Sequence, residues 1–238
     1  MFAKLNENAA LSRIPIKRAL RILLGKDLLT VIQERRPCQS FGTTYGSWTI
    51  CTEELTRDSV IYSGGVGHDV SFDVEVIQQF GAQVFAFDPT PKAVDWVKTQ
   101  LLPPQFHFYP LGISDHDGTE EFVAPENSAH VSYSSAQKIQ SAKEIVKCEV
   151  RRIKTLMSQF GHNRIDILKL DVEGSEFMIL DDVLNGYLDI GQICIEFHHR
   201  LPGIGVSKTK DALEKLYGAG YRIFFISRSG DEYSFIKT

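Results

Sequence analysis

Acidic side chains and a histidine follow two apolar segments late in the chain. Asp171 and Glu173 come directly after residues 165–170, IDILKL, and His198 follows residues 193–197, ICIEF. If these segments are neighbouring parallel strands, their carboxyl ends meet at one edge of a sheet, where open α/β sheets bind ligands. An imidazole has an unperturbed pKa of about 6.5 and can accept a proton. We therefore expect His198 to be a general base, with Asp171 and Glu173 as positioning groups.

The same groups have plainer interpretations. His198 can be a hydrogen-bonded structural histidine, and Glu173 can stabilise the N-terminus of a helix that starts at Ser175. Asp171, Glu173 and Glu196 also offer the oxygen ligands that magnesium prefers. Because only the spacing supports a cation there, we expect no metal.

An earlier glycine-rich turn can bring backbone N–H groups close to a ligand. It follows the apolar residues 60–62 and contains Ser63, Gly64, Gly65 and Gly67. A segment with apolar residues at helical spacing comes next, and a second apolar strand completes a βαβ unit. Because glycines lack side chains, the turn and the helix N-terminus can approach a ligand closely.

Asp88 closes this unit at the carboxyl end of its second strand. It stands about 20 residues after Gly67, where nucleotide-binding folds place a carboxylate on the ribose hydroxyls. Val70 occupies the place of the third glycine in the dinucleotide fingerprint, which disfavours a nicotinamide dehydrogenase. A plain strand-to-helix turn, with Asp69 capping the helix, is the alternative.

The rest of the pattern is typical of one α/β domain. Hydrophobic periodicity predicts further strands at 106–111, 120–123 and 145–150, helices at 91–102, 154–160 and 207–217, and a closing hairpin of 221–227 with 232–236. Ile113, Ser114 and Asp115 leave the third strand, where an adenine ring would lie in this architecture. The polar stretch 125–143 is expected to be a lid or a disordered loop.

The N-terminal region mixes apolar and basic residues between positions 15 and 36, which predicts one or two amphipathic helices. We favour a helix docked on the domain with a solvated basic face over a membrane-surface or nucleic-acid patch. Residues 42–50 alternate, which indicates a short strand or hairpin; Trp48 could cover a ligand, but core packing is favoured. We divide the chain into a helical extension, 1–44, and a domain, 45–238.

Composition excludes several classes of protein. The 238 residues carry a formal net charge of −4, which gives no general case for a nucleic-acid partner, and no apolar run is long enough to span a membrane. Four scattered cysteines without a CxxC pair predict buried free thiols and a cytoplasmic location. The oligomeric state stays open.

Three motifs together resemble the FkbM family of S-adenosylmethionine-dependent methyltransferases. They are GGVG at 64–67, FDP at 87–89 and IDILKLDVEGSE at 165–176, of which KLDVEGSE is the most specific. The resemblance implies a class I methyltransferase (Rossmann-like) fold, with seven strands in a mostly parallel, doubly wound α/β sheet and an antiparallel last strand. The strand and helix pattern agrees independently. By resemblance, Gly65 and Gly67 would face the methionine part of the cofactor, Asp88 the ribose, and Ile113 to Asp115 the adenine.

Ser63 departs from the family pattern, which usually has an acidic residue there that helps hold the cofactor's amino group. A serine can accept a hydrogen bond but carries no charge. We expect O-methylation of a hydroxyl on a small molecule or sugar, with a catalytically silent S-adenosylmethionine-binding protein as the alternative. Nucleic-acid methylation is disfavoured because Asp171-Val172-Glu173 stands where such enzymes usually have an Asp/Asn-Pro-Pro-aromatic run.

Overall fold

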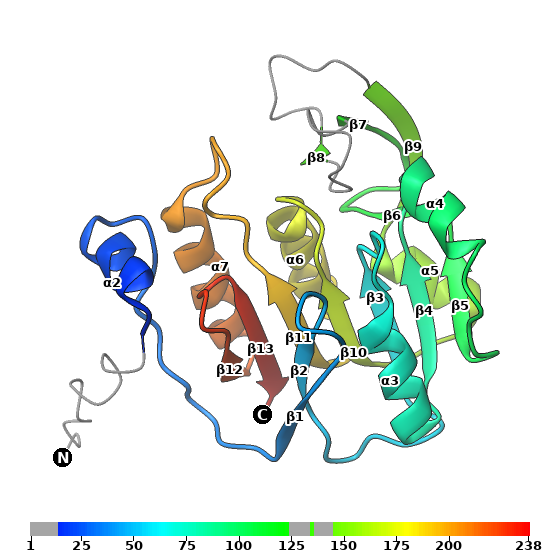
Figure 1. The fold of residues 1–238 in the computed structure, drawn as a ribbon, viewed down its shortest axis with the longest axis horizontal. Coiled ribbons are helices and arrows are strands. Elements are labelled where there is room, and N and C mark those ends of the chain that lie inside the picture. Colours follow the sequence, from blue (N-terminus) through cyan, green and yellow to red (C-terminus); the bar gives the residue numbers. More distant parts are fainter. Residues whose placement is uncertain (1–13, 124–133, 136–144) are drawn as a thin grey trace.

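A seven-stranded sheet forms the centre of the protein (Figure 1). The structure is a computed structural model and describes residues 14–123, 134–135 and 145–238, so most of the stretch 125–143 lies outside the described residues. Along the sheet the strands are β12 (Tyr221–Ile226), β13 (Glu232–Lys237), β11 (Ile190–Glu196), β10 (Ile165–Leu170), β3 (Val60–Gly64), β4 (Gln83–Phe87) and β5 (Phe106–Tyr109). β13 is antiparallel to both of its neighbours, β11 and β12, and the other adjacent strands of this sheet are parallel. The predicted doubly wound, mostly parallel α/β sheet is confirmed.

Alternation along the central strands divides the apolar side chains between two cores. Ile61 and Ile167 face one side of the sheet, whereas Tyr62 and Leu168 face the other. The Tyr62 side is covered by α5 (Ile153–Phe160), α6 (Glu176–Asn185) and α7 (Val206–Gly218). The Ile61 side is covered by α3 (Ser71–Phe80) and α4 (Pro91–Val97). Strands buried on both faces therefore appear as the continuous apolar runs of the sequence.

A hairpin of β1 (Cys38–Phe41) and β2 (Trp48–Cys51) replaces a helix over part of the Ile61 side (Figure 1). It is attached to β11 by the Gln192 side chain, whose carbonyl accepts from the Cys51 N–H at 2.8 Å and whose amide donates to the Cys51 carbonyl at 2.9 Å. The expected hairpin is present and starts earlier than residue 42. The expected division between residues 44 and 45 falls inside its turn.

Two strands expected along the chain form part of a second, four-stranded sheet. Its order is β6 (Gly112–Ile113), β9 (Ile145–Arg151), β7 (Gly118–Val123) and β8 (Ser134–Ser135), and it lies at the upper right of Figure 1. Sequence periodicity indicated β7 and β9 but not this separate pairing. α4 also ends at Val97, earlier than expected, where the Thr99 hydroxyl donates to the Trp96 carbonyl at 2.7 Å.

Between residues 15 and 36 the structure has one short helix, α2 (Ile16–Leu23), instead of helical structure up to residue 36. Gly25, at φ +66°, follows its end. The chain then runs beside β12, where the N–H groups of Gln33 and Glu34 donate to the Ile223 carbonyl at 2.8 and 3.0 Å. Pairing with this edge of the sheet takes the place of a second helix.

The orientation of α2 differs from the expected one in part, because Lys17 and Arg21 are exposed as expected but Arg18 is not. Arg18 is buried and donates to the Ser227 carbonyl at 3.3 Å, and its Nε lies 4.0 Å from the buried Asp27 carboxylate. Ile16 and Leu23 are instead about four-fifths exposed, at 80% and 82%. A buried charge needs a partner, and Asp27 with the carbonyl supplies one, so the helix attaches through its arginine.

The cysteines and the lengths of the helices complete the description of the fold. Cys51, Cys148 and Cys194 are buried free thiols as expected, but Cys38 is exposed because it lies on the outer strand of the hairpin. Among the described residues, no helix combines the length and the apolar character that crossing a membrane requires.

Replacing Gln192 with alanine tests the attachment of the hairpin. The backbone N–H and C=O of Cys51 would lose both partners in a buried position, which should lower the free energy of unfolding by about 1–3 kcal/mol. Urea denaturation measures this loss. Gln39→Ala, at an exposed position of β1, is the matched control and should change stability by less than about 0.5 kcal/mol. Equal effects of the two substitutions would contradict the attachment.

Candidate active site

The glycine loop and the end of β10 meet in direct backbone contact. Gly64 is in register with Phe87 on β4 and with Leu170 on β10, so Asp88 and Asp171 leave the sheet at the same edge. The Asp171 N–H donates to the Gly64 carbonyl at 3.0 Å. Gly65 has φ +81°, and a Cβ at this position would lie 1.8 Å from the Asp171 carbonyl oxygen. Only glycine fits here.

Asp88 holds the glycine loop in place. One oxygen accepts from the N–H groups of Val66 and Gly67, both at 2.9 Å, and the other accepts from the N–H and hydroxyl of Thr90 at 2.9 and 2.6 Å. These four donors use about all the acceptor sites of a carboxylate. A ribose contact would therefore have to replace one of these bonds, and the expected ribose role of Asp88 stays a prediction.

Lys169 holds the glycine loop through hydrogen bonds to its backbone carbonyls. Its buried ammonium group donates to the carbonyls of Gly65 at 2.5 Å and Gly64 at 3.4 Å, and it lies 5.3 Å from the centroid of the Trp48 ring. A cation over an aromatic face is stabilised by the ring quadrupole. Trp48 is thus part of the core and of the site at once.

One cavity joins the two groups of predicted site residues. Its wall includes Gly65, Gly67, Asp88, Ile113, Asp171 and Glu173. The wall does not include Ser63, Gly64, Ser114, Asp115 or His198. The Ser114 hydroxyl instead donates to the buried Glu120 at 3.2 Å, so an adenine contact from Ser114 or Asp115 stays a prediction.

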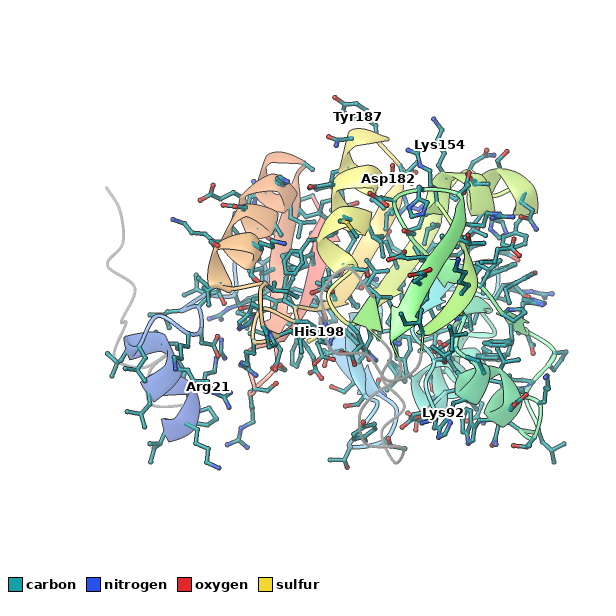
Figure 2. The ribbon with its side chains drawn as sticks, turned by 90° about the horizontal axis from the view of Figure 1, so that it is seen from above. Arg21, Lys92, Lys154, Asp182, Tyr187 and His198 are labelled. Atoms are coloured by element: carbon teal, nitrogen blue, oxygen red, sulfur yellow. The ribbon has the colours of Figure 1, made fainter. Side chains whose placement is uncertain are left out.

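Carboxylates surround His198, which lies on the segment after β11 and is labelled near the centre of Figure 2. Its Nε2 is 3.5 Å from Glu173, 3.8 Å from Asp171 and 3.9 Å from Glu196. Its Nδ1 is 3.6 Å from the fully buried Glu176, which also accepts from the His198 backbone N–H at 2.8 Å. The sequence predicted the meeting of these strand ends, and the structure brings them together.

The surrounding charges decide the protonation state of His198. Burial alone would lower its pKa, but the carboxylates of Glu176, Glu173 and Glu196 raise the pKa to about 10. At neutral pH the ring is therefore an imidazolium, which has no free nitrogen to accept a proton. This differs from the expected general-base role, because sequence spacing does not reveal how many carboxylates face one ring.

The pKa of Glu196 is higher than that of an ordinary surface glutamate. Burial and the neighbouring Asp171 carboxylate raise its pKa to about 8, against the lowering effect of His198. Glu196 also lies in the cavity wall. A carboxyl group with a pKa near the working pH is suited to general-base catalysis.

The cluster also satisfies the geometry of a cation site. Ligand atoms of Asp171, Glu196 and His198 lie within 4.8 Å of one another. Nε2 would have to lose its proton before binding a metal ion. The protonated ring and a divalent cation therefore exclude each other in this place.

Sequence reasoning missed two buried carboxyl groups beside the site, Asp73 and Glu176. Asp73 lies in the first turn of α3 and in the cavity wall, with 2% of its surface exposed. Glu176 begins α6 and supports His198 from behind. The sequence signal for Asp73 was the Ser-Phe-Asp run at 71–73, which opens the helix after the glycine loop. Asp73 lies on the buried face of that helix.

Fold and site together define a class I methyltransferase-like protein. The model of the methyltransferase FkbM domain matches residues 62–223, more than half of the chain, so the protein belongs to the FkbM methyltransferase family. The predicted family is confirmed. The match begins inside β3 and ends inside β12, so it contains the glycine loop and the carboxylate cluster.

Two curated relatives are called probable methyltransferase-like protein 24. The rat (Rattus norvegicus) protein is 27% identical over 187 residues, which cover 74% of this chain and 45% of the relative. The human (Homo sapiens) protein is 26% identical over 185 residues, which cover 73% of this chain and 44% of the relative. The chain thus spans less than half the length of these relatives.

Similar solved structures are more distant. A Methanococcus jannaschii fibrillarin pre-rRNA processing protein has a TM-score of 0.46 at 12% identity, covering 76% of this chain and 67% of that chain. Aeropyrum pernix fibrillarin, in complex with natively bound S-adenosyl-L-methionine, has a TM-score of 0.42 at 10% identity, covering 85% and 83%.

Gly65→Ala tests the contact between the loop and β10. The new Cβ would overlap the Asp171 carbonyl and the backbone would keep an unfavourable φ, so we expect a loss of about 2 kcal/mol or more in unfolding free energy. Gly81→Ala is the control, because Gly81 shares the positive φ, +71°, but an added methyl group there would have no backbone atom of another segment closer than 3.8 Å. It should cost about 1 kcal/mol. Equal losses by thermal denaturation would contradict the steric account.

The His198 ring should remain protonated up to about pH 9, which NMR titration of the ring signals measures. His199 is the internal control, because burial lowers its pKa and it should titrate below about pH 6.5. Since the folded pKa of His198 exceeds the unfolded value, its charge stabilises the fold fully below about pH 6.5 and this contribution disappears as the pH rises through about 10.

A Glu176→Gln variant should lower the pKa of His198. An unshifted pKa in that variant would contradict the proposed carboxylate cluster.

Proposed function

We propose that this protein is an S-adenosylmethionine-dependent O-methyltransferase that acts on a hydroxyl of a small molecule or sugar. The observation that carries this proposal is the single cavity lined by the glycine loop at one end and by Asp171, Glu173 and Glu196 at the other. The family supports methyl transfer. The cavity supports an arrangement in which a cofactor and an acceptor hydroxyl lie side by side.

The residues present fit a nucleoside-containing cofactor with a charged tail. Gly65 and Gly67 leave the loop without side chains at φ +81° and +54°, so the loop backbone is open to the cavity. Ile113 and Phe87 offer apolar surface in the same wall, and the Asp73 carboxyl provides a polar end. The first two would pack against the adenosine part, and the glycines would allow its approach.

Bound S-adenosylmethionine supplies an electrophilic methyl group on a sulfonium sulfur. The protein must place the acceptor oxygen in line with that group and remove the hydroxyl proton. Glu196, with its pKa raised to about 8, accepts the proton. Asp171 and Glu173 orient the acceptor through hydrogen bonds, while the His198 imidazolium holds these carboxylates together.

The charge of the cavity supports a neutral acceptor. Its wall contains Asp69, Asp171, Glu173, Glu196 and Glu232, whereas Lys169 is the one lysine or arginine among the described residues that line it. Lys169 is already occupied with the loop carbonyls. An acidic wall repels phosphate groups but offers hydrogen-bond acceptors to the hydroxyls of a polyol or sugar.

Incubation with methyl-labelled S-adenosylmethionine and a metabolite extract tests this proposal, with mass spectrometry to find labelled products. We expect a labelled ether on a hydroxylated small molecule, at a rate that rises with pH around an apparent pKa of about 8. Glu196→Gln should reduce the rate at least about 100-fold, while the exposed Glu214→Gln on α7 should not. Cofactor binding without any labelled product would favour the catalytically silent alternative. No binding of S-adenosylhomocysteine would overturn both.

A further inference from the structure

A buried carboxylate with one unpaired oxygen lies in the wall of the cavity. Asp73 has 2% of its surface exposed, and its Oδ1 has no hydrogen-bond partner in the part of the chain that the structure describes. The Ser63 hydroxyl, which is completely buried at the end of β3, also has no partner among the described residues. Buried polar atoms in folded proteins are nearly always paired. The Ser63 hydroxyl lies close enough to Asp73 to lower its pKa, yet no hydrogen bond of ordinary geometry satisfies either atom among the described residues. The unpaired Asp73 Oδ1 in the cavity wall therefore indicates that a ligand completes it.

The positive charge of Lys169, which acts on Asp73, does not fill this need. Lys169 lowers the pKa of Asp73 through its charge, but no ion pair within 4.0 Å joins the two among the described residues. The Lys169 ammonium donates instead to the carbonyls of Gly65 and Gly64. It therefore neutralises part of the charge from a distance and leaves the Oδ1 atom of Asp73 without a donor.

Asp73 keeps its charge in spite of burial. Burial raises its pKa to about 6, while Lys169 and the Ser63 hydroxyl oppose the rise. At neutral pH the group is thus mainly ionised, and a buried carboxylate attracts a cation that can donate hydrogen bonds. A primary ammonium group in the cavity fits, because it can donate to Asp73 Oδ1, while Ser63, which lies outside the cavity wall, supports the Asp73 carboxylate. A sulfonium has no hydrogen-bond donor.

We propose that Asp73, assisted by Ser63, binds the α-ammonium group of the cofactor's amino-acid tail. This inference rests on the proposed function, because it concerns the same cavity. It assigns Asp73 as the residue that makes the site select adenosyl compounds with an amino-acid tail over those without one. The tail would then lie at the first turn of α3.

A competing role for Asp73 is that of a structural counterion for Lys169. That role predicts a loss of stability, and of affinity for every ligand, when the charge is removed. Ammonium recognition instead predicts a loss confined to ligands that carry the amine. The two roles therefore differ in how one substitution affects two ligands.

Titration calorimetry with S-adenosylhomocysteine and with 5′-methylthioadenosine, which lacks the amino-acid tail, measures this difference. Asp73→Asn should weaken S-adenosylhomocysteine binding about ten- to a hundredfold and change 5′-methylthioadenosine binding by less than about twofold. Asp95→Asn, at an exposed position on α4, should change neither. An equal loss for both ligands, or no loss for either, would overturn the proposal.

Two further measurements keep the test valid if Asp73→Asn does not fold. The wild-type protein should bind S-adenosylhomocysteine at least about tenfold more tightly than its analogue with hydrogen in place of the α-amino group; equal affinities would overturn the assignment. The double variant Ser63→Asp, Asp73→Ser returns a carboxylate to the same place and should recover the preference for the amine. If the wild-type protein binds neither adenosyl compound, the proposed function fails together with this inference. If it binds both without preference, only the role of Asp73 fails.

Discussion

The site depends on the contact between the glycine loop and the carboxyl end of β10. Asp171 donates its N–H to Gly64, and Gly65 lies so close to the Asp171 carbonyl that no side chain fits between them. This contact occurs where the first strand of the βαβ unit, β3, lies beside β10, a strand about 100 residues later. It is the position at which strand order reverses in a doubly wound sheet. Because of it, the loop and the carboxylates share one cavity.

Charge is arranged differently at the two ends of this cavity. Beside the loop, one buried lysine is used by backbone carbonyls, and the Oδ1 atom of Asp73 has no hydrogen-bond partner among the described residues. At the other end, a single histidine lies among four carboxylates and is held in its protonated form. The Asp73 end therefore attracts a cation, whereas the other end already contains the His198 imidazolium. This difference in charge distinguishes a cofactor end of the cavity from an acceptor end.

The strands and their edge could be predicted from sequence because the signals are local. The run IDILKL at 165–170 is apolar and is followed at once by Asp171, so both the strand and the position of the carboxylate follow from neighbouring residues. The protonation of His198 could not be predicted in this way. It depends on Glu176, which comes from α6, and on Glu173 and Glu196, which come from the ends of two strands. Such an effect exists only after the elements have packed.

The structure of the N-terminal region also could not be predicted from local sequence, because it depends on packing against the sheet. Residues 15–36 have the composition of amphipathic helices, but the edge strand β12 offers the Ile223 carbonyl, which accepts from the N–H groups of Gln33 and Glu34. Likewise, the sequence showed that Ser63 carries no charge but not that the Asp73 carboxyl lies beside it. Asp73 is ten residues away and reaches the same place only because α3 packs its first turn over the end of β3.

The most direct test of the shared cavity is a crystal structure of the protein with S-adenosylhomocysteine. We predict that the adenosine lies against Ile113 and the glycine loop, that the sulfur atom faces the carboxylates of Asp171 and Glu196, and that the amino group contacts Asp73. A ligand bound elsewhere, or a cavity filled by the protein's own side chains with Asp171 turned away from Gly65, would contradict the account.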